Sequence, residues 1–392
     1  MNVLHIASWY PSKVQPFNGD FIQRQLKALS LHMPVYVIAA VKDDEASPDE
    51  ESWAENKLSD QFYERVCCYG SVKTGVGLID RYFSSIRYKR ILHKMVQDYI
   101  WEYGRPDLIH LHVAMNGGMV ALQLKEQLGI PFVVTEHSTI YHPAAADRLE
   151  SRFFLWRKKL KKVLSSAELI LPVSDDLGKA IQHHVPGISY KVIPNVVDTT
   201  LFFLKEKPVS NVCELVHVSG MNYQKNTVGL LNALEQLQKL RTDWHCTMIG
   251  PASETLRDLS RKKGLADRIH WAGEVSYAAV ANYMQRSHAL VLFSRYENQP
   301  CVILEALCAG LPVVSTKVGG IDEVIDASNG LFATSEQVNT LVNALDQLMK
   351  NYDAFDAKQI SSRAIAAYNY SEVGKKIKQT YEDLLASKKI SQ

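Results

Sequence analysis

The sequence has no run of apolar residues long enough to cross a bilayer, so no transmembrane helix is expected. Its first residues, MNVLHIASWYP, contain no basic region and only a short apolar run, which predicts a first β-strand rather than a secretory signal. The six cysteines show no paired metal-ligand spacing, which is typical of reduced thiols in a cytosolic protein. The formal charge of +2 gives no reason to expect a nucleic acid as a partner. We therefore expect a cytoplasmic protein, at most peripheral to the inner face of the membrane.

The sequence also lacks the motifs that hold catalytic metals and dinucleotides. No Asp-x-Asp motif occurs, and no group of His and Cys residues has the spacing of a zinc site. The Gly-x-Gly candidate, GVGLID at residues 75–80, lacks a third glycine and does not open a convincing βαβ unit. We therefore expect neither a metal ion nor a cofactor.

What the chain does contain is a regular alternation of short aliphatic runs with helical patterns. At 392 residues it exceeds the usual size of one hydrophobic core, so two domains are expected. Strands of the first half are predicted at VLHIA, VYVIAA, DLIHLHV, PFVVTEH, ELILPVS and KVIPN, and strands of the second half at ELVHVSG, WHCTMIG, RIHWAG, HALVLFS, PVVST and NGLFA. Near-continuous apolar strands separated by helices predict, in each half, a doubly wound parallel α/β sheet covered on both faces.

The junction between the halves is expected in PNVVDTTLFFLKEKPVSNV, which lacks periodicity and contains two prolines. This places the domains at residues 1–196 and 197–370, followed by a terminal helix at residues 371–392. The polar, acidic residues 42–65 are expected to form a loop. Sheets of this kind bind ligands outside the carboxyl ends of their strands, so two Rossmann-like domains facing each other would enclose a cleft for two substrates.

The stretch SRYENQPCVILEAL carries two carboxylates, Glu297 and Glu305, after a predicted strand. Pro300 fits the first turn of a helix, and the amides of Cys301 and Val302 would then form an anion site at the helix N-terminus. A nucleotide sugar, which carries phosphates between two polyhydroxylated ends, would use all of these features. On spacing alone, two solvated acids explain the pattern equally well.

This stretch, continued as CAGLPVVSTKVGGIDEVI, resembles the donor-site signature of glycosyltransferase family 4, the retaining enzymes of the GT-B fold. The two glutamates fall on the acidic positions of the signature, and the similarity covers most of residues 213–350. The resemblance implies that Glu305 holds the nucleotide ribose, that Glu297 contacts the donor sugar beside the reacting carbon, and that the Pro300–Val302 turn faces the diphosphate. The family usually has Gly-Phe-Gly after the first acid, whereas this chain has Asn298-Gln299-Pro300, so the resemblance does not name the sugar.

A second segment, VHVSGMNYQKNTVGLL, resembles the family's Gly-Arg-Leu-x-x-x-Lys-Gly sequence. Lys225 falls on the lysine, which is implied to neutralise charge on the departing diphosphate. Gly220 takes the place of the arginine, so one of two expected cations is missing. Apart from this match, a lysine at a strand-to-helix turn would more often be a surface residue.

The first domain supplies further candidates. In PFVVTEHST, His137 falls where the family has a histidine near the reactive side of the donor sugar, although a loop histidine bonded to the backbone is the alternative. In DLIHLHVAMNGG, His110 and His112 share one face of a strand; His112 and Asn116 are expected to contact the acceptor, and His110 to be a packed residue. Gly19 opens a helix and would let the backbone approach the donor phosphates or the acceptor, or else form an ordinary tight turn.

The basic segment SRFFLWRKKLKKVL predicts a helix with apolar residues on one side and, elsewhere, the cations Arg157, Lys158, Lys159, Lys161 and Lys162. A core helix with a solvated basic face is the favoured interpretation. The alternative is peripheral contact of residues 152–164 with an anionic membrane that carries a lipid-linked acceptor.

The sequence thus predicts a metal-independent, retaining glycosyltransferase in polysaccharide or cell-envelope biosynthesis. It would move a hexosyl unit from a nucleoside diphosphate sugar to a hydroxyl of a saccharide or lipid-linked saccharide, with Glu297, Lys225 and His137 as the catalytic group. Two alternatives stay open: a nucleotide-sugar epimerase of the same fold, and a silent nucleotide-sugar-binding subunit, which Gly220 suggests.

Overall fold

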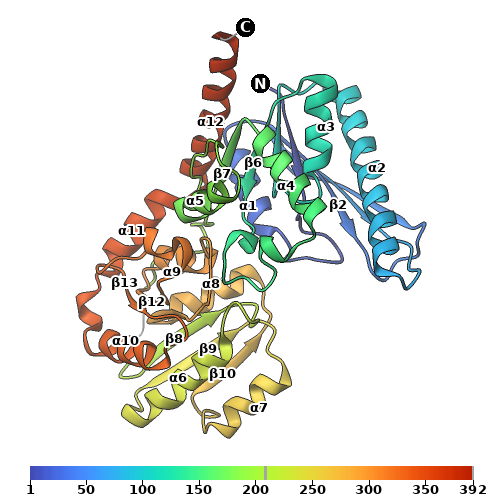
Figure 1. Ribbon diagram of the computed structural model, residues 1–392. Helices are drawn as coiled ribbons and strands as arrows, with labels where there is room; N and C mark the ends of the chain where they lie inside the picture. The colour runs from blue at the N-terminus through green and yellow to red at the C-terminus, as the bar shows by residue number, and fades with distance from the viewer. Residues whose placement is uncertain (207–209, 391–392) are drawn as a thin grey trace. The chain divides into compact units, whose positions relative to one another are not determined.

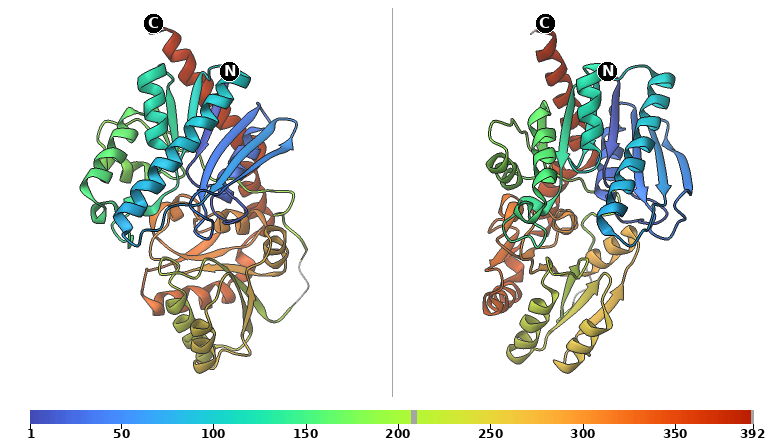
Figure 2. Two further views of the ribbon diagram at one scale, coloured as in Figure 1. Left: turned by 90° about the vertical axis from the view of Figure 1, so that its right-hand side faces the viewer. Right: turned by 45° about the vertical axis from the view of Figure 1, so that its right-hand side comes forward.

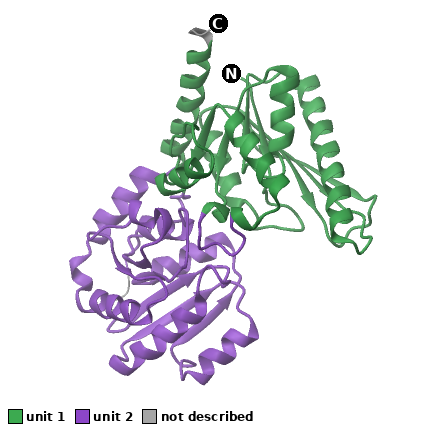
Figure 3. Ribbon diagram, in the orientation of Figure 1, with its two compact units in different colours: residues 1–141, 149–196, 370–392 green, residues 142–148, 197–369 purple. Residues whose placement is uncertain are grey.

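The computed structural model describes residues 1–206 and 210–390 (Figure 1), and its contacts divide the chain into two compact units (Figure 3). Unit 1 consists of Met1–Tyr141, Leu149–Val196 and the chain from Tyr370 onward, and unit 2 consists of His142–Arg148 and Val197–Asn369. The change of unit after Val196 coincides with the junction expected from the sequence. Residues 142–148, which the sequence analysis placed in the first domain, instead belong to unit 2 by their contacts.

Unit 1 is built on a seven-stranded sheet in the order β3-β4-β2-β1-β5-β6-β7, in which only β3 is antiparallel to its neighbour. Its strands are β1 (Val3–Ala7), β2 (Val35–Lys42), β3 (Glu51–Ser59), β4 (Phe62–Tyr69), β5 (Leu108–His112), β6 (Phe132–Glu136) and β7 (Leu169–Pro172). Its helices are α1 (Asp20–Leu29), α2 (Gly77–Tyr103), α3 (Gly118–Leu128), α4 (Phe154–Ser166), α5 (Asp175–His184) and α12 (Tyr370–Ile390), with 3-10 turns η1 (Thr139–Tyr141) and η2 (Leu149–Ser151).

Both faces of this sheet are covered, which explains why its central strands are apolar throughout. Because side chains alternate along a strand, Leu4 and Ile6 of β1 pack toward α2, α3, α4 and α5, whereas Val3 and Ala7 pack toward α1 and α12. The two views in Figure 2 show α2 lying across the sheet, where it contacts β2.

Two local expectations for unit 1 were wrong. Residues 42–65 are not a loop: they include β3 and the start of β4, an antiparallel pair at the sheet edge. β3 escapes a pattern search because most of its side chains are exposed, so its backbone pairing rather than an apolar face holds it. Conversely, KVIPN forms no named strand. Its amides at Lys191 and Ile193 bond to β7, but Pro194 has no N–H with which to continue the ladder.

Unit 2 contains a parallel six-stranded sheet in the order β10-β9-β8-β11-β12-β13. Its strands are β8 (Cys213–Val218), β9 (Trp244–Ile249), β10 (Ile269–Gly273), β11 (Ala289–Leu292), β12 (Val313–Thr316) and β13 (Gly330–Ala333). Its helices are α6 (Thr227–Leu240), α7 (Glu254–Lys262), α8 (Tyr277–Arg286), α9 (Cys301–Cys308), α10 (Val338–Lys350) and α11 (Ala357–Tyr368), with turns η3 (Gly319–Glu323) and η4 (Tyr352–Ala354).

The core of unit 2 also has two layers. One layer lies under α8, α9 and α11, and the other under α6, α7 and α10. None of the helices in the described residues of either unit combines the length and the apolar character that a membrane span requires.

Candidate active site

The sheet of unit 2 reverses its strand order between β8 and β11, which are hydrogen-bonded neighbours. In open α/β sheets this is the place where ligands bind, because the loops leaving the two strands diverge there. Lys225 lies in the loop after β8, and Glu297 lies in the loop after β11. The fold therefore brings two of the predicted catalytic residues to the ligand-binding edge of one sheet.

These two side chains touch. The Lys225 ammonium (Nζ) lies 2.5 Å from Glu297 Oε1, and the exposed fractions of the two side chains are 18% and 5%. Ser294 donates a second hydrogen bond to Oε1 at 2.7 Å, and Gln224 donates to Oε2 at 3.1 Å. Three donors from two loops therefore hold the carboxylate of Glu297 in position although it is almost fully buried.

A buried histidine, His217, supports the turn that carries Lys225. Nδ1 of His217 in β8 donates to Val291 O (2.9 Å), Nε2 accepts from the hydroxyl of Ser219 (2.7 Å), and Ser219 Oγ accepts from the amide of Met221. Burial lowers the pKa of His217 to about 4, so its ring is neutral at physiological pH. Gly220 is exposed in this turn, and a Cβ at this position would meet no atom closer than 3.9 Å. A Cβ therefore fits there without a clash, and no strained backbone angle requires glycine.

The second predicted acid is on α9. Pro300 precedes the helix as its N-cap residue, Cys301 begins it and Val302 follows, with both of these side chains partly buried. Glu305 is buried one turn further along, at 3% exposure. The acid and the start of the helix thus have the relative placement that the sequence predicted. Their roles toward a nucleotide stay predictions.

The loop after Glu297 has a support that the sequence did not reveal. Nε2 of His142 lies 2.8 Å from Oδ1 of Asn298, and both side chains are buried. The amide of Gly320 donates to the backbone carbonyl of Asn298 at 2.9 Å. Asn298 stands where the family has its first glycine, and His142 is 156 residues away in the chain. The sequence signal that could have pointed to this contact is His142 itself, a second histidine five residues after His137.

In unit 1, the loop after β1 ends at Gly19, which caps α1 in the left-handed region (φ 73°). A Cβ at Gly19 would lie 2.6 Å from the carbonyl of Trp9, so only glycine allows this backbone approach. The close approach of the backbone to Trp9 therefore explains why a glycine stands at position 19, and its role toward a ligand stays a prediction.

His137 follows β6, and its position is fixed by its neighbour. Glu136 is fully buried, and its Oε1 accepts the amides of His137 and Ser138 at 2.9 Å each. Its Oε2 accepts the amide of Ala114 and the hydroxyl of Tyr141, both at 3.1 Å. Burial raises the pKa of Glu136, and these hydrogen bonds offset part of the rise. One carboxylate therefore joins the loop after β6 to the loop after β5.

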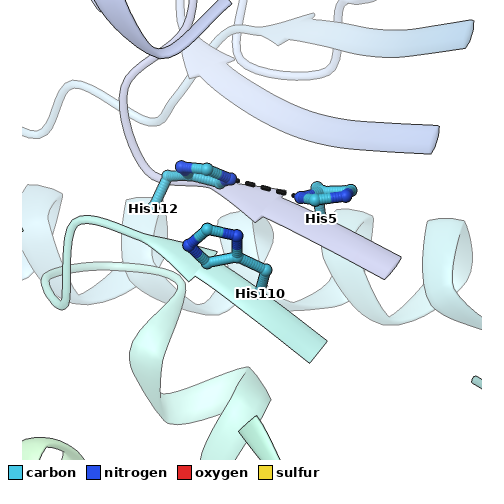
Figure 4. A group of neighbouring side chains, drawn as sticks. All are labelled: His5, His110 and His112. Atoms are coloured by element: carbon cyan, nitrogen blue, oxygen red, sulfur yellow. Dashed lines mark hydrogen bonds between the residues drawn. The ribbon is translucent and has the colours of Figure 1, made fainter. Parts of the chain in front are cut away.

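His112 does not lie on the surface as expected for an acceptor contact. It is 1% exposed and belongs to a group with His5 and His110, shown in Figure 4. Nδ1 of His5 lies 3.3 Å from Nε2 of His112, and the rings of His110 and His112 are 4.0 Å apart, as their alternate spacing on β5 requires. Asn116, by contrast, is exposed.

Sequence spacing missed this histidine group because His5 comes from β1 and the other two residues from β5. Burial holds the pKa of all three far below the usual value, so the rings are uncharged. Neutral imidazoles whose nitrogens lie within 4.8 Å of one another could ligate a metal. Both ring nitrogens of His110 already have partners, however, in Tyr381 and Thr135, so a metal would have to displace one of them.

Comparison with known proteins assigns the family. Residues 32–201 match the family described as Glycosyltransferase Family 4, and residues 203–367 match the one described as Glycosyl transferases group 1. The chain is a group 1 glycosyltransferase. Its two Rossmann-like units form the GT-B fold, and its reaction is the transfer of a sugar from a nucleotide sugar.

The relatives of this glycosyltransferase are distant. It is 24% identical over 370 residues to the putative teichuronic acid biosynthesis glycosyltransferase TuaC of Bacillus subtilis, with 88% of each chain covered. It is 25% identical over 305 residues to a glycogen synthase of Mycobacterium tuberculosis, covering 74% of this chain and 71% of that one.

Solved structures agree in fold. Sucrose-phosphate synthase from Thermosynechococcus elongatus superposes with a TM-score of 0.78 at 18% identity, covering 99% of this chain and 100% of that one. Anabaena Alr3699/HepE in complex with UDP and glucose gives a TM-score of 0.70 at 16% identity, with 98% and 100% covered.

Proposed function

We propose that this glycosyltransferase moves a hexosyl unit from a nucleoside diphosphate sugar to a hydroxyl group of a saccharide or lipid-linked saccharide, with retention of configuration and without a metal ion. The observation that supports this most directly is the contact of Lys225 with Glu297 at the point where the sheet of unit 2 reverses its strand order. A cation and an acid at this edge suit a ligand with a diphosphate next to sugar hydroxyls.

In the proposed reaction, the bond between the sugar's C1 and the β-phosphate oxygen breaks, and its electron pair stays on the phosphate. The acceptor oxygen bonds to C1 on the same face, and its proton goes to the departing phosphate oxygen. Lys225 stabilises the charge that develops on the diphosphate, and the carboxylate of Glu297 faces the carbon that becomes positive. Glu305 holds the nucleotide ribose, and His137 orients the sugar or the acceptor.

A panel of nucleoside diphosphate sugars tests the donor site first. A sugar nucleotide that binds the folded state raises the melting temperature, so the preferred donor will give the largest shift. The same donor is then incubated with and without acceptors in excess chelator. Transfer that needs an acceptor and survives chelator supports the proposal. Conversion of the donor alone indicates an epimerase, and binding without turnover indicates a silent subunit. Activity that returns only with added manganese or magnesium contradicts metal independence.

A further inference from the structure

The first three turns of α2 expose an apolar stripe. Its members are spaced so that they share one side of the helix. They are Leu78, Ile79, Tyr82, Phe83 and Ile86, with exposed fractions of 76%, 42%, 64%, 45% and 48%. Later in the same helix the apolar residues, such as Leu92 and Met95, are buried against the sheet. Large apolar side chains gathered in this way usually mark a surface that something else covers.

The start of α4 exposes a second apolar group. Phe153, Phe154 and Leu155 are 73%, 63% and 54% exposed, while Leu160 and Val163 of the same helix are buried in the core. The helix is therefore anchored to unit 1 by one side and presents its first turn outward. Between residues 151 and 167 the chain has six basic residues and no acidic one.

These two groups belong to one region of unit 1. Ser85 and Lys89 of α2 and Trp156 and Lys159 of α4 line the same cavity, which has a volume of about 140 Å³. Asn116, the residue expected to contact the acceptor, lines it as well. The α2 stripe and the start of α4 thus belong to the two helices that line this cavity, beside the loop that follows β5.

We propose that the α2 stripe and the start of α4 form one surface that docks unit 1 on a bilayer containing anionic lipids. The apolar side chains enter the interface between headgroups and acyl chains, and the cations of α4 contact lipid phosphates. This membrane surface rests on the proposed function in one respect, the nature of the acceptor. It makes the acceptor a lipid-linked saccharide, which would reach the cavity beside Asn116 from the membrane.

The distribution of charge favours a bilayer over a protein partner. The centres of protein–protein interfaces are poor in lysine, whereas four lysines lie at positions 158–162, shortly after the exposed apolar residues of α4. One of them, Lys162, also forms an ion pair with Glu126. The chain as a whole is close to neutral at +2, so this basic segment is a local feature and not a consequence of overall composition. Lysines beside exposed aromatic residues are the pattern of helices that lie in an anionic interface.

Co-sedimentation of the full chain with vesicles tests the surface without any substrate. We expect binding to vesicles of phosphatidylcholine with 30% phosphatidylglycerol, weak binding to phosphatidylcholine alone, and release by high salt. Two double variants remove apolar side chains and should each lower the partition coefficient about tenfold or more: Phe153→Ser/Phe154→Ser and Leu78→Ser/Phe83→Ser. A third, Lys158→Gln/Lys159→Gln, removes charge and should lower the partition coefficient only on anionic vesicles, by about fivefold per lysine. Trp101→Ser is the matched control, because Trp101 is 86% exposed at the other end of α2.

All substituted side chains are exposed, although Lys159 also lines the cavity, and thermal unfolding checks that every variant folds. Absence of binding to anionic vesicles, or equal binding by the three double variants and wild type, would overturn the proposal. A wild-type dimer that Phe153→Ser/Phe154→Ser dissociates, without vesicle binding, would assign the surface to a second copy of the chain. Failure of the transfer reaction is a separate result, since vesicle binding needs neither donor nor acceptor. Loss of transfer to a lipid-linked acceptor, with transfer to its water-soluble analogue kept, would support the link to the acceptor.

Discussion

Replacing Lys225 by alanine should damage both the stability of unit 2 and the reaction, and the two effects can be separated. The ammonium lies 2.5 Å from a carboxylate whose side chain is only 5% exposed. Breaking a buried ion pair by removing one partner costs about 3–5 kcal/mol. Lys225 keeps 18% of its side-chain surface exposed, and Ser294 and Gln224 still bond to Glu297, so we expect the lower end of this range.

A loss of about 3 kcal/mol corresponds to a fall in melting temperature of roughly 6–12 °C for a unit of this size. The double variant Lys225→Ala/Glu297→Gln should recover part of this loss, because a neutral amide no longer needs a counter-ion and its oxygen can keep the hydrogen bond from Ser294, whereas its nitrogen cannot accept from Gln224. Turnover should fall by about 10²-fold or more in both variants, since both lack the cation that we propose faces the diphosphate. Thermal unfolding and steady-state kinetics on the same preparations measure the two effects.

Lys263→Ala is the control. Its ammonium lies 2.6 Å from Glu235 in the same unit, but the glutamate is 32% exposed, so we expect a loss below about 1 kcal/mol and unchanged turnover. If Lys225→Ala folds and transfers sugar normally, Lys225 does not serve the diphosphate. If the double variant is no more stable than Lys225→Ala alone, the ion pair is not the source of the destabilisation.

Four other substitutions test the remaining parts of the site. Glu305→Ala should weaken nucleotide binding by about 1.5–3 kcal/mol in calorimetric titration, the range for a charged hydrogen bond, and unchanged affinity in a folded variant would remove Glu305 from the site. Glu297→Gln should lower turnover while nucleotide affinity stays close to wild type; equal losses in both would make Glu297 a binding residue instead. Gly220→Arg should fold with a melting temperature close to wild type, because a Cβ there meets nothing within 3.9 Å, and a misfolded variant would contradict this. Glu136→Gln replaces one of the two carboxylate oxygens, each of which accepts a loop amide, by an NH₂ group that cannot accept. The free energy of unfolding should therefore fall by about 1–3 kcal/mol, and unchanged thermal unfolding would show that the carboxylate does not join the loops.

The parts of the fold that depend on short-range pattern were predictable from the sequence. Within residues 1–206 and 210–390, aliphatic runs marked eleven of the thirteen strands, and β3 and β4 were missed. The loop holding Glu297 and the helix holding Glu305 were predictable for the same reason, since both lie within one short motif. The change of unit after Val196 falls in the stretch that lacks periodicity.

The contacts that fix these residues could not be predicted, because they join segments far apart in the chain. Lys225 and Glu297 are 72 residues apart, and His142 and Asn298 are 156 residues apart. No spacing rule covers such distances; they depend on which strands become neighbours in the sheet. His112 is another example of a contact that sequence spacing cannot predict. Its place on β5 was predicted, but its burial beside His5 depends on the pairing of β5 with β1.

The missing arginine at Gly220 gives the contact between Lys225 and Glu297 a further consequence. In the structure the charge of Lys225 is neutralised by Glu297, so in the proposed mechanism the diphosphate competes with Glu297 for the ammonium. Binding must therefore draw the ammonium toward the phosphate, at least in part. Ser294 and Gln224 hold Glu297 through both of its oxygens, so the carboxylate keeps its place when Lys225 moves. Glu297, which we propose faces the sugar, would then lose its counter-ion when the donor binds. A carboxylate without a counter-ion stabilises positive charge that develops on a nearby carbon in the transition state. In this mechanism the donor's own phosphates make Glu297 available to stabilise the transition state.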